Sequence, residues 1–155
     1  MIIRPRGEDP RMEALREAVG RLRAGGHRVW PRLTFERGDA RRFAEDAAQA
    51  RCDVVVAAGG DGTVNEVVNG IVRCRWQPRL GIVPVGTAND FASGLGLPSA
   101  VPDAVGVAVQ GRPLAVDVAR VNRRYFINVS TGGFGAEATA ASPTEQKRKL
   151  GAFAY

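Results

Sequence analysis

One segment of the chain, Asp53–Ala58, constrains the fold more than any other. After its first residue it is an unbroken run of valine and alanine, with the sequence DVVVAA. A run of this kind without polar alternation is typical of a parallel strand that is buried on both faces. The glycine-rich stretch Gly59–Gly62 follows at once, and branched apolar residues then recur at helical spacing from Val64 to Val72. The sequence therefore predicts a strand, a tight loop and an amphipathic helix, the repeating unit of an α/β sheet.

The remainder of the first 112 residues alternates in the same way between short apolar runs and helical patterns. A mostly parallel sheet with helices on its faces is the expected architecture, since strands that alternate with helices join through crossovers. We expect, in order, strand Met1–Arg4, helix Arg11–Ala24, strand Val29–Phe35, a helix with Asp39 as its N-cap, strand Leu80–Val85, a short helix near Phe91 and helix Val101–Val109.

The pattern changes near residue 112, where we place a domain boundary between 1–112 and 113–155. Apolar residues alternate from Leu114 to Val118, and Tyr125–Val129 predicts a second strand after a turn near Asn122. Two strands with no helix between them indicate an antiparallel hairpin. The region 113–155 is therefore expected to begin a β-rich domain. Its glycine-rich segment Ser130–Gly135 fits either the wall of a cleft or a simple turn.

Composition excludes several classes of protein. The formal net charge is +6, which fits either an arginine-rich composition that needs no partner or attraction to a nucleotide, an anionic lipid or a nucleic acid, and charge alone does not choose among them. No apolar run approaches the roughly 20 residues of a membrane span, and the first residues lack the pattern of a signal peptide. Cys52 and Cys74 form neither a disulfide framework nor a zinc motif. We expect a cytoplasmic protein.

The glycine loop after the buried strand carries the first candidate chemistry. Gly60 and Gly62 have no Cβ, so their backbone can approach a ligand closely, and Thr63 stands where a helix N-terminus favours phosphate. The loop matches neither the Walker A pattern nor GxGxxG. A tight turn capped by Asp61 or Thr63 is the plainer interpretation. Against it, a carboxylate beside phosphates is useful only if it binds magnesium-bound water or takes a proton from a hydroxyl.

Two further strand ends carry similar residues. Pro84–Ala92, with the sequence PVGTANDFA, again joins a strand to a helix, and the strand that ends near Thr34 brings another hydroxyl. The carboxyl ends of parallel strands share one edge of a sheet, where ligands bind in α/β folds. Three such ends favour a nucleotide site over three coincidental turns.

The segments GGDGTVNEVVNG and PVGTANDFASGLGLP together resemble the diacylglycerol kinase catalytic-domain family. The likeness extends through LTFERGDARRFAEDA and AVDVARVNRRYFINVSTGGFGAE, and nearly the whole chain is similar to bacterial YegS-type lipid kinases. NAD kinases and phosphofructokinases carry loops related to GGDGT, and the sequence GTANDFA separates the lipid-kinase branch from them. The resemblance implies a Rossmann-like, phosphofructokinase-like sheet followed by the first strands of a β-rich domain.

The resemblance also implies phosphoryl transfer from ATP, with Mg²⁺, to a lipid hydroxyl such as that of diacylglycerol or phosphatidylglycerol. Asp61 would be the catalytic carboxylate, as hydroxyl base or magnesium partner. Thr34 and Thr87 would contact the nucleotide from neighbouring strand ends. The residues expected to wrap the phosphates are Gly59, Gly60, Asp61, Gly62, Thr63, Val64 and Asn65.

The sequence departs from the family in two places. Family members open with a strand and a polar turn, often Asn-Pro, that touches the nucleotide, whereas this chain has Arg4-Pro5-Arg6, so no contact is assigned there. They also continue into a larger second domain with acidic magnesium ligands, so no metal ligand is assigned here. An NAD kinase-like enzyme and a non-catalytic nucleotide-binding fragment are the alternatives. The expected partners are ATP and a lipid at the inner membrane surface, not nucleic acid, with a homo-oligomer left open.

Overall fold

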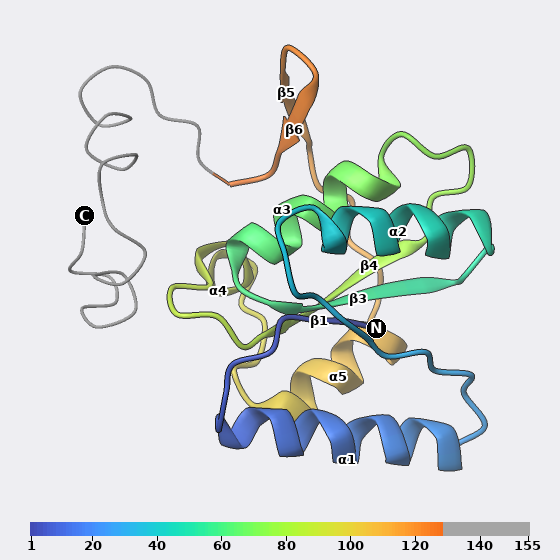
Figure 1. The fold of residues 1–155 in the computed structure, drawn as a ribbon, viewed down its shortest axis with the longest axis vertical. Helices are drawn as coiled ribbons and strands as arrows, with labels where there is room; N and C mark the ends of the chain where they lie inside the picture. Colours follow the sequence, from blue (N-terminus) through green and yellow to red (C-terminus); the bar gives the residue numbers. More distant parts are fainter. Residues whose placement is uncertain (129–155) are drawn as a thin grey trace.

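A computed structural model describes residues 1–128, in which four strands form a parallel sheet (Figure 1). The strands are β1 (Ile2–Ile3), β2 (Arg32–Leu33), β3 (Val54–Gly59) and β4 (Arg79–Pro84), in the spatial order β2-β1-β3-β4. β3 and β4 lie within a residue of the two strands predicted most directly by apolar runs. The part of the predicted second domain beyond residue 128, with its segment Ser130–Gly135, lies outside the described residues.

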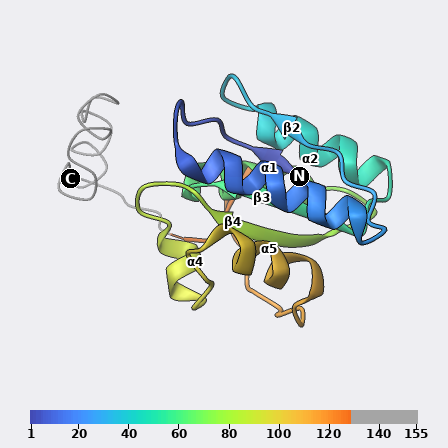
Figure 2. The same ribbon diagram turned by 90° about the horizontal axis from the view of Figure 1, so that it is seen from below.

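Helices cover both faces of the sheet, as expected. α2 (Asp39–Gln49) and α3 (Asp61–Ile71) lie on one face, and α1 (Pro10–Ala24) and α5 (Val101–Gln110) on the other (Figures 1 and 2). The short α4 (Asp90–Gly94) follows the loop after β4. No helix within residues 1–128 is both long enough and apolar enough to cross a bilayer. The α/β fold class is confirmed.

The buried strand β3 divides its side chains between two cores. Val55 and Ala57 face the cluster with α2 and α3, while Val56 and Ala58 face the cluster with α1 and α5. Successive strand residues point to opposite faces, so both sets must be apolar when both faces are covered. This two-sided burial is the physical reason for the uninterrupted apolar run.

Two features between β1 and α2 differ from expectation, the length of β2 and the residue that caps α2. A strand was predicted over Val29–Phe35, but only Arg32–Leu33 pairs, because β2 is an edge strand whose one neighbour, β1, is two residues long. Asp39 was predicted as an N-cap, and this prediction is wrong. Gly38 is the N-cap, with a φ of 95° that suits glycine, and Asp39 is the first helical residue.

The Asp39 carboxylate instead closes the turn that precedes α2. It accepts hydrogen bonds from the N–H groups of Phe35 at 2.9 Å and Glu36 at 3.2 Å, and Arg42 binds its other oxygen at 2.7 Å. The Phe35 N–H, then the Arg42 guanidinium and then the Glu36 N–H lower the pKa of Asp39 to about 2. Glu66 of α3 accepts the Gly38 N–H at 3.1 Å, which ties this turn to the next helix.

The region after α5 forms the predicted antiparallel hairpin with a shifted first strand. β5 (Ala119–Val121) pairs with β6 (Arg124–Phe126), and Asn122 turns the chain at a φ of 54°. The strand expected over Leu114–Val118 is wrong, since these residues form no strand and Leu114 is 73% exposed. The alternation that predicted it therefore serves no buried face among the described residues.

Candidate functional site

The strand order creates one point in the sheet where the chain changes direction. From β1 the chain passes through α1 to β2 on one side, while β3 lies on the other side of β1. Ligands of open α/β sheets bind outside the carboxyl ends of the strands at such a switch point. The chain leaves β1 toward Arg6 and leaves β3 at Gly60, so these residues flank it.

α3 begins directly after β3, without a separate loop. Gly60 is its N-cap in an extended conformation, and the Val64 N–H donates the first hydrogen bond of the helix, 3.1 Å to the Gly60 carbonyl. The N–H groups of Asp61, Gly62 and Thr63 thus stand ahead of that bond without intrahelical acceptors. This end of α3 has the donors and the positive dipole end that an anion prefers.

Gly59 has a packing role that the sequence does not reveal. A Cβ on Gly59 would clash with the side chain of Thr63. Only glycine leaves room at position 59 for the Thr63 side chain where β3 leads into α3. Gly62, in contrast, is exposed and would place a Cβ in open space. The glycines of the motif therefore divide between internal packing and an open face at the helix N-terminus.

The loops after β3 and β4 meet through backbone. A Cβ on Gly86 would collide with the Cα of Gly60 and would lie 2.5 Å from Asn89 Oδ1. Asn89, in the left-handed conformation with a φ of 56°, accepts the Gly86 N–H at 2.9 Å and donates to the Gly86 carbonyl at 3.1 Å. The expectation that the loops after the two strands share one edge of the sheet agrees with this contact.

The carboxylate of Asp61 bridges these two loops. Its Oδ2 accepts the Asp90 N–H at 3.1 Å and its Oδ1 accepts the Phe91 N–H at 3.0 Å. These are N-terminal amides of α4, so Asp61 caps the following helix and not its own. Asn128 donates from Nδ2 to the same Oδ1 at 3.4 Å. One carboxylate thus joins the start of α3, the start of α4 and the segment after β6.

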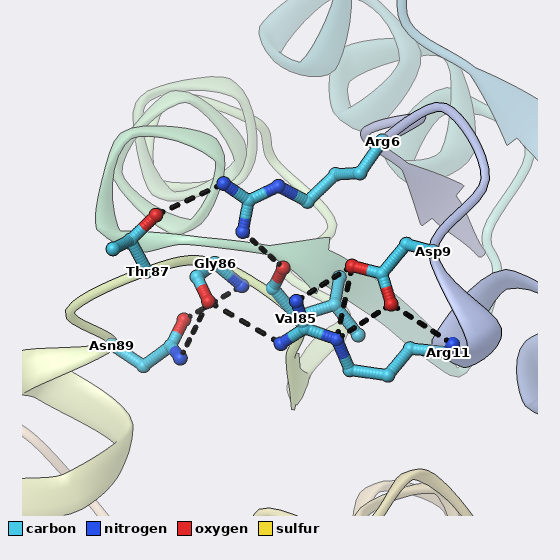
Figure 3. A network of polar contacts seen from close by, with 7 residues as sticks. All are labelled: Arg6, Asp9, Arg11, Val85, Gly86, Thr87 and Asn89. Carbon is cyan, nitrogen blue, oxygen red and sulfur yellow. Dashed lines mark hydrogen bonds and ion pairs between the residues drawn. The ribbon is translucent and has the colours of Figure 1, made fainter. Parts of the chain in front are cut away.

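Arg6 is the site residue that sequence reasoning missed (Figure 3). Its Nη1 donates to the Val85 carbonyl and its Nη2 to Thr87 Oγ1, both at 2.9 Å. Arg6 therefore binds the loop after β4 on either side of Gly86. The strand order that puts β1 beside β3 was the missing information, because local sequence shows a basic Arg-Pro-Arg segment without showing what it faces.

A second arginine supports this arrangement. Arg11 donates to the Gly86 carbonyl at 3.4 Å and pairs with Asp9 at 2.6 Å, where Asp9 also caps α1 (Figure 3). The Arg11 side chain, followed by the Arg11 N–H, lowers the pKa of Asp9 to about 2. Two positive charges, from Arg6 and Arg11, therefore lie at the loop after β4.

The structure separates the two threonines predicted to contact a nucleotide. Thr87 is exposed beside Arg6. Thr34 is buried at 4% exposure, and its hydroxyl donates to the Ile3 carbonyl at 3.4 Å. Val64 is buried in the core, and Asn65 stands one turn into α3. The helix N-terminus, Thr87 and Asp61 are thus gathered together, while Thr34 follows β2 at the same edge of the sheet but on the far side of β1.

Comparison with known proteins identifies the family to which this arrangement belongs. A family model described as "Diacylglycerol kinase catalytic domain" matches residues 2–121. The chain belongs to the diacylglycerol kinase catalytic domain family. Among its relatives is "Probable lipid kinase YegS-like" of Chromohalobacter salexigens, which is 47% identical over 96% of this chain and 49% of its own length.

Other relatives agree with this assignment. "Probable lipid kinase YegS-like" of Citrobacter koseri is 42% identical over 100% of this chain and 52% of its own length. The crystal structure of a diacylglycerol kinase from Bacillus anthracis covers 97% of this chain and 50% of that protein, at 30% identity and a TM-score of 0.75. The chain spans about half the length of the curated relatives it matches.

Proposed function

We propose that this chain is the nucleotide-binding part of a lipid kinase that transfers a phosphoryl group from ATP to a lipid hydroxyl. The observation that carries the proposal is the convergence, at the switch point of the sheet, of the α3 N-terminus, the loop after β4 and the Arg6 guanidinium. Phosphoryl transfer depends chiefly on positioning and on neutralising phosphate charge. These groups supply oriented N–H donors and a positive charge for that purpose.

The phosphates would bind at the N–H groups of Asp61, Gly62 and Thr63. Arg6 would contribute charge from the side of β1, and the exposed Thr87 hydroxyl would offer a further polar contact. Gly59 and Gly60 serve the site by permitting close packing of its two loops. Thr34 would act through the position of β1, because its hydroxyl is already bound to Ile3.

Mg²⁺ would be held at this edge of the molecule by Asp61. Residues 1–128 contain no cluster of three metal-ligating side chains. Magnesium sites in such enzymes commonly use one or two carboxylates and take their remaining ligands from water and substrate phosphates. When bound, Mg²⁺ would neutralise phosphate charge. Asp61 itself holds α4 against the site and retains capacity to accept one more donor, which leaves open a second role toward the lipid hydroxyl.

The acceptor would be a membrane lipid with a free hydroxyl, such as diacylglycerol or phosphatidylglycerol, met at the inner membrane surface. The hairpin β5–β6 would begin a second, β-rich domain, whose boundary would fall near residue 113. A nucleotide-binding module without catalysis is the second candidate. An NAD kinase-like activity is disfavoured by the sequence GTANDFA.

Two measurements on this chain test the proposal. The first is calorimetric titration with Mg-ATP, and the second is transfer of labelled γ-phosphate from Mg-ATP to mixed-lipid micelles. Gly62→Asp is the decisive variant, because an acidic residue suits a helix N-terminus yet repels phosphate. We expect the wild type to bind ATP and Gly62→Asp to bind at least tenfold more weakly. Equal affinities would contradict the proposed site, and ATP binding without labelled lipid would favour the non-catalytic module.

A further inference from the structure

A stripe of polar side chains runs along one face of α3. Asp61, Asn65 and Asn69 recur every four residues, and Arg73 continues the spacing just beyond the helix. Residues four apart lie above one another on a helix. The stripe begins at the proposed phosphate-binding terminus and ends about three turns away. The stripe therefore connects that terminus with the segment that packs near the other end of α3.

The segment 125–128 lies along this stripe in the opposite direction. The main chain of Tyr125 is hydrogen-bonded to Asn69, and the Arg73 guanidinium lies 5.5 Å from the centre of the Tyr125 ring. At the other end, Asn128 meets Asp61. Ile127, between them, packs against the core cluster that contains α3. Figure 1 shows the hairpin beside α3, on the side of the sheet that carries α2 and α3.

Asn69 forms the most directional of these contacts. Its Nδ2 donates to the Tyr125 carbonyl at 2.7 Å and to the Asn65 carbonyl at 2.9 Å, while its Oδ1 accepts the Tyr125 N–H at 2.9 Å. Both main-chain groups of Tyr125 are thus satisfied by a single side-chain amide. A neighbouring strand would satisfy a strand residue in the same manner. Few side chains other than an amide present a donor and an acceptor in this geometry.

We propose that Asn69 is a positioning residue that docks the β5–β6 hairpin on α3 and so brings the Asn128 amide to the Asp61 carboxylate. The functional part of this inference rests on the proposed nucleotide site. The contact fixes the position of the segment over about two turns of helix, from Asn69, where Tyr125 is bound, to the end of α3 where phosphates would bind. The segment after β6 thus enters the phosphoryl-transfer site in a register set by Asn69.

The docking is tested without nucleotide by amide hydrogen exchange and NMR on the 155-residue chain. Asn69→Ala removes both bonds to Tyr125, and Asn69→Asp keeps the acceptor but sets a carboxylate oxygen against the Tyr125 carbonyl. Gln77→Ala is the matched control, because Gln77 donates an exposed side-chain hydrogen bond to the Val72 carbonyl near the same end of α3. Unchanged exchange of β3 amides verifies that each variant is folded.

We expect exchange of the Tyr125 amide to become about tenfold faster in both Asn69 variants, given the usual contribution of such bonds. The Asn128 side-chain amide signals should move toward those of a free amide in the same variants. Gln77→Ala should leave both observations within about twofold of the wild type. Tyr125 exchange as slow as in the wild type, or unmoved Asn128 signals, would overturn the inference.

Addition of Mg-ATP then connects the docking to the site. In the wild type, ATP should shift the Asn128 side-chain signals, because Asn128 contacts the carboxylate at the α3 N-terminus. In Asn69→Ala the shift should vanish while the ATP affinity stays within about twofold, because the phosphate donors are untouched. A shift that persists in Asn69→Ala would refute the positioning role. A wild type that binds no ATP would refute the proposed function instead, with the docking still decided by exchange.

Discussion

Gly62 separates folding from ligand binding more cleanly than any other position of the site. A methyl group at this position meets no protein atom within 4 Å. The residue is exposed and lies in the first turn of α3, where alanine is a better helix former than glycine. We expect Gly62→Ala to raise the free energy of unfolding by about 0.5 kcal/mol, less than the full interior value. The thermal midpoint should rise by about 1–2 °C.

The same methyl group should weaken nucleotide binding. The Cα–Cβ bond of a helical residue tilts toward the helix N-terminus, so this Cβ would project into the space in front of α3. A phosphate oxygen must approach an N–H group to about 2.9 Å to form a hydrogen bond, and the methyl group would obstruct that approach. We expect the Kd for Mg-ATP to rise about tenfold, equivalent to about 1.4 kcal/mol.

Calorimetric titration and thermal unfolding of the same samples measure both effects. Gly20→Ala is the matched control, because Gly20 is also exposed, also helical and also free of atoms within 4 Å of a Cβ, but lies in the middle of α1. It should stabilise the fold by about 1 kcal/mol with no change in ATP affinity. Wild-type affinity in Gly62→Ala would refute the phosphate site, and lower stability would refute the geometry of the α3 N-terminus.

Three further expectations concern the loops and helix contacts. Gly70→Ala would set a Cβ 2.6 Å from the Arg41 carbonyl oxygen, so urea unfolding should show a loss of about 1–3 kcal/mol from forced separation of α2 and α3. Hydrogen bonds lower the pKa of Asp39 from 3.8 to about 2. Its stabilisation is therefore complete above pH 3.8 and is lost as the pH falls through about 2. Asp39→Asn should flatten that part of the stability profile, and an unchanged profile would contradict the assignment. Arg6→Gln should weaken ATP binding about fivefold at low salt and less at high salt, because screening reduces the charge contribution. A salt-independent loss would instead indicate that Arg6 acts through loop geometry.

The strands of the fold were predictable in proportion to their burial. β3 and β4 are covered on both faces, so their side chains must be apolar, and the sequence marks each to within a residue. β2 has one partner and two exposed residues, so its length depends on pairing with β1 and not on its own composition. The alternation at Leu114–Val118 predicted a strand that does not form, because an apolar pattern does not by itself supply a surface for the strand to pack against.

The site was predictable where a motif expresses a backbone requirement. The sequence marks Gly59, Gly60 and Gly86 as glycines without showing why. A Cβ on Gly59 or Gly86 would clash with a neighbouring residue, and a Cβ on Gly60 would lie 3.2 Å from the Cα of Gly86. Arg6 was missed because its role follows from strand order. Asn69 was missed because its partner is the main chain of Tyr125, which has no side-chain signature. Contacts between a side chain and a distant backbone leave no trace that spacing can reveal.

Asp61 shows why a single carboxylate is difficult to assign to one role. Its two oxygens accept N–H groups from Asp90, Phe91 and Asn128, out of about four lone-pair positions. Removal of the carboxylate would therefore release α4 and the hairpin segment together with any contact to a hydroxyl or a magnesium-bound water. Loss of activity in Asp61→Ala alone would not distinguish a general base from a residue that holds α4 and the hairpin segment in place. Asn69→Ala releases the hairpin while the carboxylate and its bonds to α4 stay, so comparing the two variants removes the share of the hairpin from the effect of Asp61→Ala. What is left is the capping of α4 together with any contact of Asp61 to a hydroxyl or a magnesium-bound water.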